Sequence, residues 1–306
     1  MLRFALRRAL LALAVGLAVS AIAFLLLRVS GDLAAALAGE DAPAAEVERI
    51  RAQFGLDRPL ALQYAEWLGR ALMGDLGRSL FYPQSVATLI LDRLPNTALL
   101  ATLGLALALI ISIPLGVAAA LGRNTWVDRL ALGLAVLGQA MPNFWFALVL
   151  IIIFGLTLQW VPISGSEGFA AFILPAVSLG WFSAPVLMRL TRAGMVEVLA
   201  ADYIRTAHAK GLPVRLVLFK HALRNAIVPV VALASVQFGN MLSGSVVIET
   251  VFALQGIGYL AWESISRRDF PVVQGILLVV ALFYVVLTMV SDLLNAWLDP
   301  RIRRGG

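Results

Sequence analysis

Long apolar runs, separated by shorter polar segments, dominate the pattern of the chain. An α-helix needs roughly 20 mainly apolar residues to cross about 30 Å of hydrocarbon, and runs of about this length recur along the sequence. They cover residues 10–27, 97–121, 130–154, 172–190, 226–247 and 272–294. The pattern predicts an all-α polytopic membrane protein with six transmembrane helices. Because the first run is longer than the apolar core of a signal peptide, we expect it to remain as an uncleaved span.

Composition supports this interpretation. Of the 306 residues, 61% are hydrophobic and 14% are charged, and the mean hydropathy is +0.90, values typical of a membrane protein. The net charge of +6 does not indicate nucleic-acid binding, because most basic residues lie between the apolar runs. The absence of cysteine excludes disulfides, thiolate metal sites and a cysteine nucleophile.

Basic residues predict the orientation, since the short cytoplasmic loops of membrane proteins carry an excess of Lys and Arg. With the N-terminus inside, the cytoplasmic side holds Arg3, Arg7, Arg8, Arg123, Arg129, Arg189, Arg192, Arg205, Lys210, Arg215, Lys220, Arg224, Arg301, Arg303 and Arg304. The short outer loops hold Arg267 and Arg268, and the other outer basic residues lie between Arg28 and Arg93, in a segment long enough to translocate regardless of charge. Both chain ends are therefore predicted to be cytoplasmic.

Three parts follow from this topology. Residues 1–28 form an N-terminal segment and the first transmembrane helix, residues 29–95 an extracytoplasmic helical insertion, and residues 96–306 a five-helix core with a cytoplasmic loop at about 191–225. The insertion carries two amphipathic patterns, one with Val47, Ile50 and Phe54 and one with Leu60, Tyr64, Trp67, Leu68 and Ala71. They predict two surface helices, which either cap the bundle or dock an outside protein. In the last outer loop, Gly256 and Gly258 precede a predicted short helix.

Several of the predicted spans contain helix-breaking prolines. The prolines predicted to kink the spans are Pro114, Pro142, Pro175, Pro185 and Pro229.

Asp292 lies within the last span and Glu249 near the outer end of the fifth. An ion-coupled transporter usually places charged ligands near the bilayer midplane, so we expect the energy source to lie outside this chain.

Uncharged polar residues within the spans are the candidates for a hydrated translocation pathway. They are Gln139, Asn143, Gln237, Asn240, Ser243 and Ser245. Such groups can present hydrogen-bond donors and acceptors to a polar solute. The alternative is that they form hydrogen bonds between neighbouring helices, and the sequence leaves both interpretations open.

Signatures of catalysis are absent from the sequence. It has no GxxxxGK[ST] phosphate loop, no HExxH motif and no nucleophile elbow. The histidines, His208 and His221, lie in the basic cytoplasmic loop without an adjacent carboxylate cluster. We therefore expect no catalytic residue, cofactor or metal site in this chain.

The basic loop between the fourth and fifth spans reads DYIRTAHAKGLPVRLVLFKHALRNAIVP over residues 202–229. Gly211 and Pro213 mark a break between two helices. The side chains expected on one face are Tyr203, Ala207 and Leu212, and those expected around it are Arg205, Lys210 and Arg215. An apolar knob with a basic rim is suited to the groove of a soluble partner domain.

This loop carries a family resemblance. DYIRTAHAKGL followed by KHALRNAIVPVV resembles the cytoplasmic EAA loop of bacterial ABC-importer permeases, in the form of the dipeptide/oligopeptide branch. The same order of blocks continues along the chain with GDLGRSL, LPNT, AMPNFW, RLTRAGMVEVL, VVIETVF, RRDFPVVQG and DPRIR. Two departures are Arg205-Thr206-Ala207 in place of Glu-Ala-Ala, and Leu33 where the branch has proline after Gly31-Asp32.

The resemblance implies a type I permease in the bacterial inner membrane that forms half of a pathway for peptides, with nickel or glutathione as alternative cargo. Its implied partners are a second homologous permease, two cytoplasmic ATPases that bind ATP and Mg, and an extracytoplasmic solute-binding protein. A short helix over about 206–216 would dock in an ATPase groove and act as a lever. The implied coupling residues are Asp202, Tyr203, Arg205, Thr206, Ala207, Ala209, Lys210, Gly211, Leu212 and Arg215.

Overall fold

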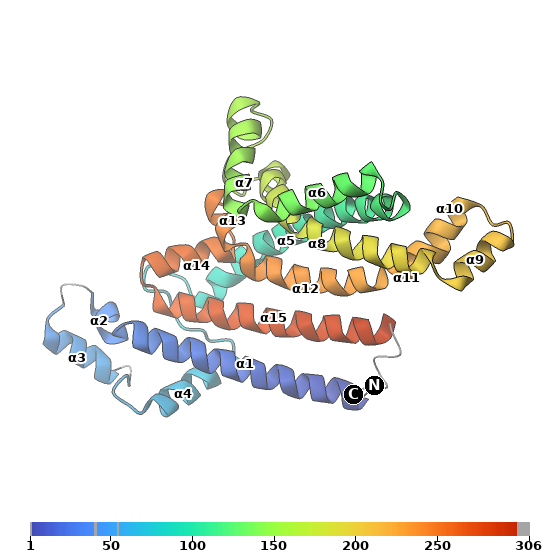
Figure 1. Cartoon of the computed structure of the whole chain (residues 1–306). Coiled ribbons are helices and arrows are strands. Elements are labelled where there is room, and N and C mark those ends of the chain that lie inside the picture. Colours follow the sequence, from blue (N-terminus) through green and yellow to red (C-terminus); the bar gives the residue numbers. More distant parts are fainter. Residues whose placement is uncertain (1, 40–41, 54, 299–306) are drawn as a thin grey trace.

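Long helices that run side by side form the body of the protein (Figure 1). The computed structural model describes residues 2–39, 42–53 and 55–298, and this part of the chain is helical with no named strand. The long helices are α1 (Leu2–Ser30), α5 (Val86–Leu121), α8 (Ile173–Leu199), α12 (Val228–Gly244) and α15 (Phe270–Leu298). Helix α1 begins and α15 ends at the end of the body that carries α9 and α10, whereas α14 lies at the opposite end (Figure 1).

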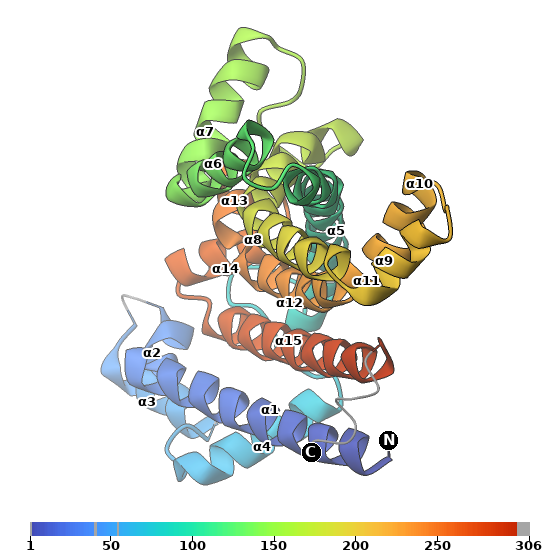
Figure 2. The ribbon, with the colours of Figure 1, turned by 45° about the vertical axis from the view of Figure 1, so that its right-hand side comes forward.

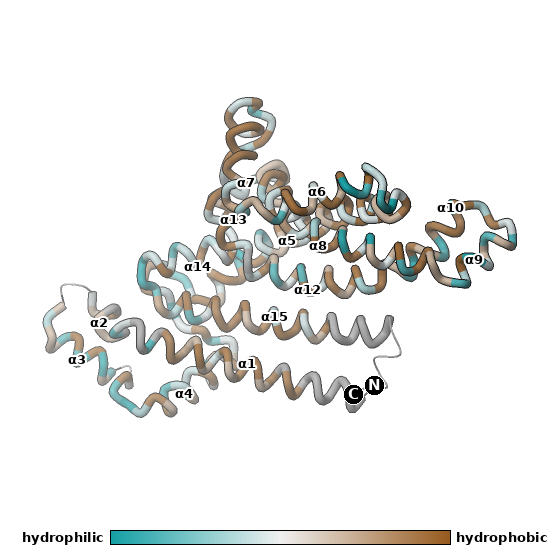
Figure 3. The backbone as a smooth tube through the Cα atoms, viewed as in Figure 1, coloured by the Kyte–Doolittle hydropathy of each residue, from teal (hydrophilic) through white to brown (hydrophobic). Residues whose placement is uncertain are grey.

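Three helical stretches are individually long and apolar enough to cross a membrane, namely Val86–Leu121, Phe169–Leu199 and Phe270–Val290. Two bent pairs pass the same test together, Trp126–Ala140 with Asn143–Thr157 and Val214–Ala226 with Val228–Ser243. Helix α1 adds a shorter apolar stretch, Leu13–Leu26. Hydrophobic residues predominate along these helices, and hydrophilic ones gather on α3 and α9 (Figure 3). The all-α membrane fold is confirmed, and the count of six spans stays a prediction.

A corner at Pro142 divides the predicted third span. Helix α6 (Trp126–Ala140) meets α7 (Asn143–Leu150) at 100°. Met141, the residue before the proline, adopts extended backbone angles, as the proline ring requires of its predecessor. Helix α7 and the π-helical η1 (Ile151–Thr157) therefore stand across the body in both views (Figures 1 and 2). The predicted kink at Pro142 is confirmed as a 100° bend, and the span over 130–154 stays a prediction.

The other prolines have milder effects. Pro229 lies in the first turn of α12, at a 49° bend, and Pro175 lies in the first turn of α8. Pro114 and Pro185 lie inside α5 and α8, which continue through them as single helices.

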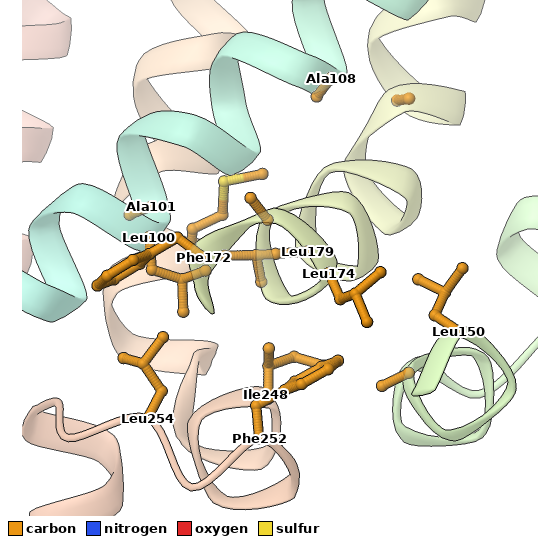
Figure 4. Close-up of a cluster of buried hydrophobic side chains, with 14 of the residues drawn as sticks. Leu100, Ala101, Ala108, Leu150, Phe172, Leu174, Leu179, Ile248, Phe252 and Leu254 are labelled. Carbon is orange, nitrogen blue, oxygen red and sulfur yellow. The ribbon is translucent and has the colours of Figure 1, made fainter. Parts of the chain in front are cut away.

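Helices α5 and α8 form the closest pair in the structure's centre, because small residues occupy their contact. A Cβ atom on Gly180 would lie 2.6 Å from the carbonyl oxygen of Gly104, and one on Gly116 would lie 2.6 Å from Cβ of Thr191. Small residues at such contacts let two helix backbones approach, which favours packing in lipid. In Figure 4, Leu100 of α5 lies among side chains of α8 and of α13 (Val246–Val251), in the largest buried cluster.

A second buried cluster closes the end of the body opposite α9. It joins α5, the short helix α14 (Ile257–Ser266) and α15 through Val86, Leu89, Ile90, Ile257, Leu260, Val272 and Ile276. The predicted short helix in this loop is confirmed, although it begins at Ile257, so that Gly258 lies inside it.

The N-terminal insertion contains the two predicted surface helices, α3 (Ala44–Gln53) and α4 (Leu60–Leu72), preceded by α2 (Leu33–Ala38). The carboxylate of Asp32 caps α2 by accepting hydrogen bonds from the N–H groups of Ala34 and Ala35. Tyr64 of α4 shares a 2.7 Å hydrogen bond with Ser20 of α1, which ties α4 to the first span. Phe54 and the DPRIR motif lie outside the described residues. Helix α5 begins at Val86, so the predicted boundary between residues 95 and 96 falls inside it.

The close α5–α8 contact predicts that a Gly→Ala substitution changes stability differently inside and outside the contact. Gly180→Ala should lower the free energy of unfolding by about 1–3 kcal/mol, because the added methyl group collides with a backbone carbonyl of α5. Gly133→Ala on α6 is the matched control, since no atom lies within 4 Å of the added carbon. There the same change should be neutral or stabilise by roughly 0.5–1 kcal/mol. Thermal unfolding in detergent measures both, and equal effects would contradict the contact.

Candidate functional site

Residues Asp202 to Ala226 form a helical elbow between α8 and α12. Helix α9 (Asp202–Ala209) is followed by a break, and the chain resumes as α10 (Val214–Leu216), the π-helical η3 (Val217–Leu223) and α11 (Arg224–Ala226). Gly211 has φ +73°, in the left-handed region, and its N–H donates to the carbonyl of His208 at 2.9 Å. This is a common way to end a helix, so the predicted break at Gly211 and Pro213 is confirmed. A single helix over 206–216 is wrong for the same reason.

The inner face of the elbow packs against the chain's own helices. Ile204 and Ala207 are buried with Val217 and Ala222 of the elbow itself and with Met195 of α8. Leu212 packs against the same cluster, to which α5 contributes Ala120. The prediction that Ala207 forms part of an outward apolar knob is therefore wrong, because its side chain is buried inside the elbow, whereas Leu212 is only partly buried.

The outer face of the elbow carries a different set of apolar side chains. Val214 is 67% exposed, Phe219 61% and Tyr203 44%, and Leu216 is also exposed. We call these four residues the elbow surface. Exposed basic residues surround them in the chain, namely Arg205, Lys210, Arg215, Lys220 and Arg224. Large apolar side chains exposed among charges are typical of a protein-docking surface.

The remaining predicted coupling residues lie on α9. Asp202 and Arg205 form an exposed ion pair with a 3.1 Å separation, and the hydroxyl of Thr206 donates to the carbonyl of Asp202. Ala209 is exposed at the end of the helix. The hydroxyl of Tyr203 accepts a hydrogen bond from Asn225 at 3.0 Å, which joins α9 to α11 across the elbow.

A partly buried ion pair fixes the helices next to the elbow. The guanidinium of Arg192 on α8 donates to both carboxylate oxygens of Asp128 on α6, at 2.6 and 2.7 Å. Asp128 also accepts the N–H of Asn124 at 3.0 Å. Two-point contacts of this kind constrain orientation as well as distance. The distribution of basic residues predicts a cytoplasmic position for Arg192, whereas nothing in the sequence marks Asp128 as its partner, because the two residues lie on different helices.

The six predicted pathway residues fall in three places. Gln237, Asn240 and Ser243 lie on one stretch of α12, where Asn240 donates to Gln237 at 3.1 Å and Ser243 to the carbonyl of Gly239. Asn240 and Ser243 are exposed. The next two residues flank the α6–α7 corner. Gln139 accepts a hydrogen bond from Arg189 at 2.8 Å, and the buried Oδ1 of Asn143 has no hydrogen-bond partner in the described part of the chain.

Ser245 lies apart from these residues, in a buried polar cluster around Glu249. The Glu249 side chain is completely buried, and its carboxylate accepts hydrogen bonds from Ser245 at 2.7 Å, Thr97 at 2.8 Å and the N–H of Tyr259 at 3.0 Å. Thr97 in turn accepts the N–H of Ile257 at 2.8 Å. The cluster therefore joins α5, α13 and α14 at the end of the body opposite the elbow.

Two glycines at the start of α14 make this cluster possible. A Cβ atom on Gly258 would lie 2.6 Å from Cα of Val246, and one on Gly256 would collide with the Glu249 carboxylate. These glycines are the signal by which the sequence could have located the cluster, since a close backbone approach often requires glycine.

Most of the chain matches two models of one protein family. The family described as "Binding-protein-dependent transport system inner membrane component" matches residues 112–304, and the N-terminal family of the same transport system membrane component matches residues 1–101. The chain belongs to this family of transport permeases. It is the permease subunit of a binding-protein-dependent ABC importer, located in a bacterial inner membrane, and its system includes a solute-binding protein and ATPase subunits. Family membership excludes the ion-coupled alternative.

Relatives of this permease match it almost end to end. A putative peptide transport system permease protein of Brucella abortus (strain 2308) is 41% identical over 307 residues, which cover 97% of this chain and 98% of that protein. The glutathione transport system permease protein GsiC of Escherichia coli (strain K12) is 40% identical over 286 residues, covering 93% and 94%.

Solved structures support the same permease fold. The MetNI methionine ABC transporter in inward-facing conformations matches with a TM-score of 0.57 and 16% identity, over 69% of this chain and 96% of that chain. An amino acid ABC transporter with histidines matches with a TM-score of 0.51 and 18% identity, over 70% and 94%. At these identities the likeness concerns the fold alone.

The buried cluster predicts a large effect from a conservative substitution in the permease. Glu249→Gln keeps the shape but replaces one acceptor oxygen by an NH2 group, so at least one buried donor loses its partner, at a cost of about 1–3 kcal/mol. Glu167→Gln is the control, because Glu167 is exposed. We expect a lower midpoint of thermal unfolding in detergent for Glu249→Gln and no change for Glu167→Gln. A Glu249→Gln protein as stable as the parent would contradict the hydrogen-bonded cluster.

Proposed function

We propose that this permease subunit forms half of a translocation pathway for peptides and that a cytoplasmic ATPase docks on the elbow surface. The exposure of Phe219 and Val214 carries the second part of the proposal. A subunit gains no stability from apolar side chains held in water, and a partner groove that covers them does. The basic rim then favours a partner groove with acidic residues at its edge.

The packing of the elbow would transmit a shift of the elbow to the membrane-spanning helices. Its inner face is fastened to Met195 of α8 and Ala120 of α5 through a continuous buried cluster, and α11 leads directly into α12. A packed cluster moves as a unit, so a shift of the docked elbow shifts these helices together. ATP binding and hydrolysis on the partner would bias two positions of the elbow, with no catalytic group supplied by this chain.

The exposed polar face of α12 is the proposed lining of the pathway. Gln237, Asn240 and Ser243 offer amide and hydroxyl groups without a charge, which suits the peptide bonds of a solute that varies in its side chains. A second, homologous permease would supply the opposite wall. The insertion over residues 29–95 would form the extracytoplasmic layer beside the five-helix core and face the solute-binding protein.

The names of the relatives support a peptide as the solute class. The Brucella abortus relative is named for peptide transport and the Escherichia coli relative for glutathione transport. Glutathione is itself a tripeptide, so both names describe small molecules with amide bonds. Nickel remains the alternative cargo of the wider family.

A charge placed on the elbow surface should uncouple the transporter. Phe219→Asp should weaken ATPase binding at least tenfold, because burial of one Phe side chain is worth about 1.5–3 kcal/mol. The test uses the complete reconstituted transporter and measures co-purification of the ATPase together with solute-stimulated ATP hydrolysis. Leu72→Asp is the control for co-purification, since Leu72 is 80% exposed on α4, away from the elbow. Normal coupling in Phe219→Asp would refute docking on this surface.

Removal of a polar group from the pathway should alter transport alone. Asn240→Leu should lower peptide uptake severalfold by taking away an exposed amide, whereas ATPase co-purification should not change. Ser235→Leu is the control, because Ser235 lies on a different side of α12 and its hydroxyl donates to the helix's own backbone at Val231. Uptake of a dipeptide into vesicles measures the effect. An equal loss in both variants would show that the helix, rather than its polar face, is responsible.

A further inference from the structure

A cavity lies at the end of the body opposite the elbow, beneath the N-terminal insertion. Its volume is about 550 Å³, and it opens between the ends of α1 and α4, the segment 75–80 and the start of α15. A neighbouring hollow of about 1080 Å³ shares Leu37, Leu80 and Phe270 with it. A cavity of several hundred Å³ is large enough for a small-molecule or headgroup ligand.

The walls of this cavity are fixed by buried hydrogen bonds. Gln63 on α4 donates to the carbonyls of Leu56 and Arg58 at 3.0 and 2.8 Å, which holds the α3–α4 turn against the helix. On the other side, the buried carboxylate of Asp269 accepts hydrogen bonds from the hydroxyl of Ser79 and the N–H of Leu80. The segment 75–80 is therefore fastened to the start of α15, and the cavity does not depend on a loose loop.

Positive charge dominates the polar lining. Arg28, Arg70 and Arg78 line the cavity, and none of the three forms an ion pair within the described residues. Arg28 donates through Nε to Gln63 at 3.0 Å, and its guanidinium lies 4.6 Å from the ring centre of Phe24. Neither contact involves a carboxylate.

The two carboxylates in the lining are already engaged. Glu66 pairs with Arg58 at 2.9 Å, and Asp75 accepts the N–H of Gly77 at 2.9 Å. Gln274, which also borders the cavity, is 7% exposed. Its Nε2 has no hydrogen-bond partner among the described residues. Three guanidinium groups therefore face one carboxylate, Asp75, that is not ion-paired among the described residues, and this excess of positive charge suits an anion with several oxygen atoms such as a phosphate group.

The rest of the lining is apolar, which indicates an amphiphile rather than a free anion. Leu37, Leu56, Leu76, Trp67 and Phe270 border the same space. Helix α4 beside it ends at Leu72, and Leu72 and the following Met73 are 80% and 88% exposed. Exposed apolar residues and a Trp at the end of membrane-spanning helices are typical of the headgroup region of a bilayer.

We propose that this cavity binds an anionic phospholipid, with the phosphate held by Arg28, Arg70 and Arg78 and the glycerol and first chain carbons against the apolar lining. The ligand would join the insertion to α1 and α15 at the rim of the membrane.

The complete transporter in detergent tests this proposal by native mass spectrometry with equal amounts of palmitoyl-oleoyl phosphatidylglycerol and phosphatidylcholine. Arg70→Gln and Arg78→Gln should each lower phosphatidylglycerol retention about fivefold, the effect of one basic residue near an anionic lipid. Arg49→Gln removes the same charge from α3, where Arg49 pairs with Glu46 outside the cavity, and should leave retention unchanged. Leu37→Trp narrows the cavity without a change of charge and should lower retention as well, which keeps the test valid if an arginine variant does not fold.

Three results would overturn the proposal. One is equal retention in the parent protein, the two arginine variants and Leu37→Trp. Another is no preference for phosphatidylglycerol over phosphatidylcholine in the parent protein. The third is displacement of the lipid by glycerol 3-phosphate at equal concentration, which would assign the cavity to a soluble phosphate compound.

Discussion

The close backbone contact between α5 and α8 is the constraint on which the rest of this permease depends. Apolar helices in lipid gain little from the hydrophobic effect when they meet, so their packing depends on how closely the backbones approach. Gly104, Gly116 and Gly180 permit that approach here, and a single methyl group at Gly180 would meet a backbone oxygen. Helices α6, α7 and α12 then pack on α8, so the position of the α5–α8 pair sets the position of most of the core.

An ion pair at one end of the core and a hydrogen-bonded carboxylate at the other also hold the helices together. Near the elbow, Arg192 and Asp128 hold α8 to α6. At the opposite end, the carboxylate of Glu249 joins α5, α13 and α14. Buried polar groups of this kind tolerate few alternative arrangements, because every displaced donor loses its partner. The exposed polar face of α12 lies between helices whose ends are fixed in this way, which suits a pathway that opens through rigid-body movement.

The elbow combines attachment with recognition. Ala207 and Leu212 attach it to the core, and Val214 and Phe219 remain exposed. Since the attachment cluster includes side chains of α5 and α8, the surface that a partner would move is connected to the helix pair at the centre of the fold. If an ATPase docks there as proposed, this arrangement would connect it physically to the membrane-spanning helices.

The sequence alone determined the membrane class, most helices, the break at Gly211 and the short helix after Gly256, because each depends on local hydrophobicity or on the backbone limits of glycine and proline. The order of motifs also pointed to the permease family. Tertiary structure decided the rest. Pro142 is compatible with either a mild kink or a corner, and only the packing of α7 against α8 and α13 fixes the 100° angle. Ser245 is a small polar residue of the kind expected along a pathway. It is buried instead, because its hydroxyl donates to Glu249, whose carboxylate also binds Thr97 from a distant part of the chain. Ala207 faces inward because Met195 and Val217 lie beneath it. Periodicity places a residue on a helix face, and the neighbouring helices decide what that face contacts.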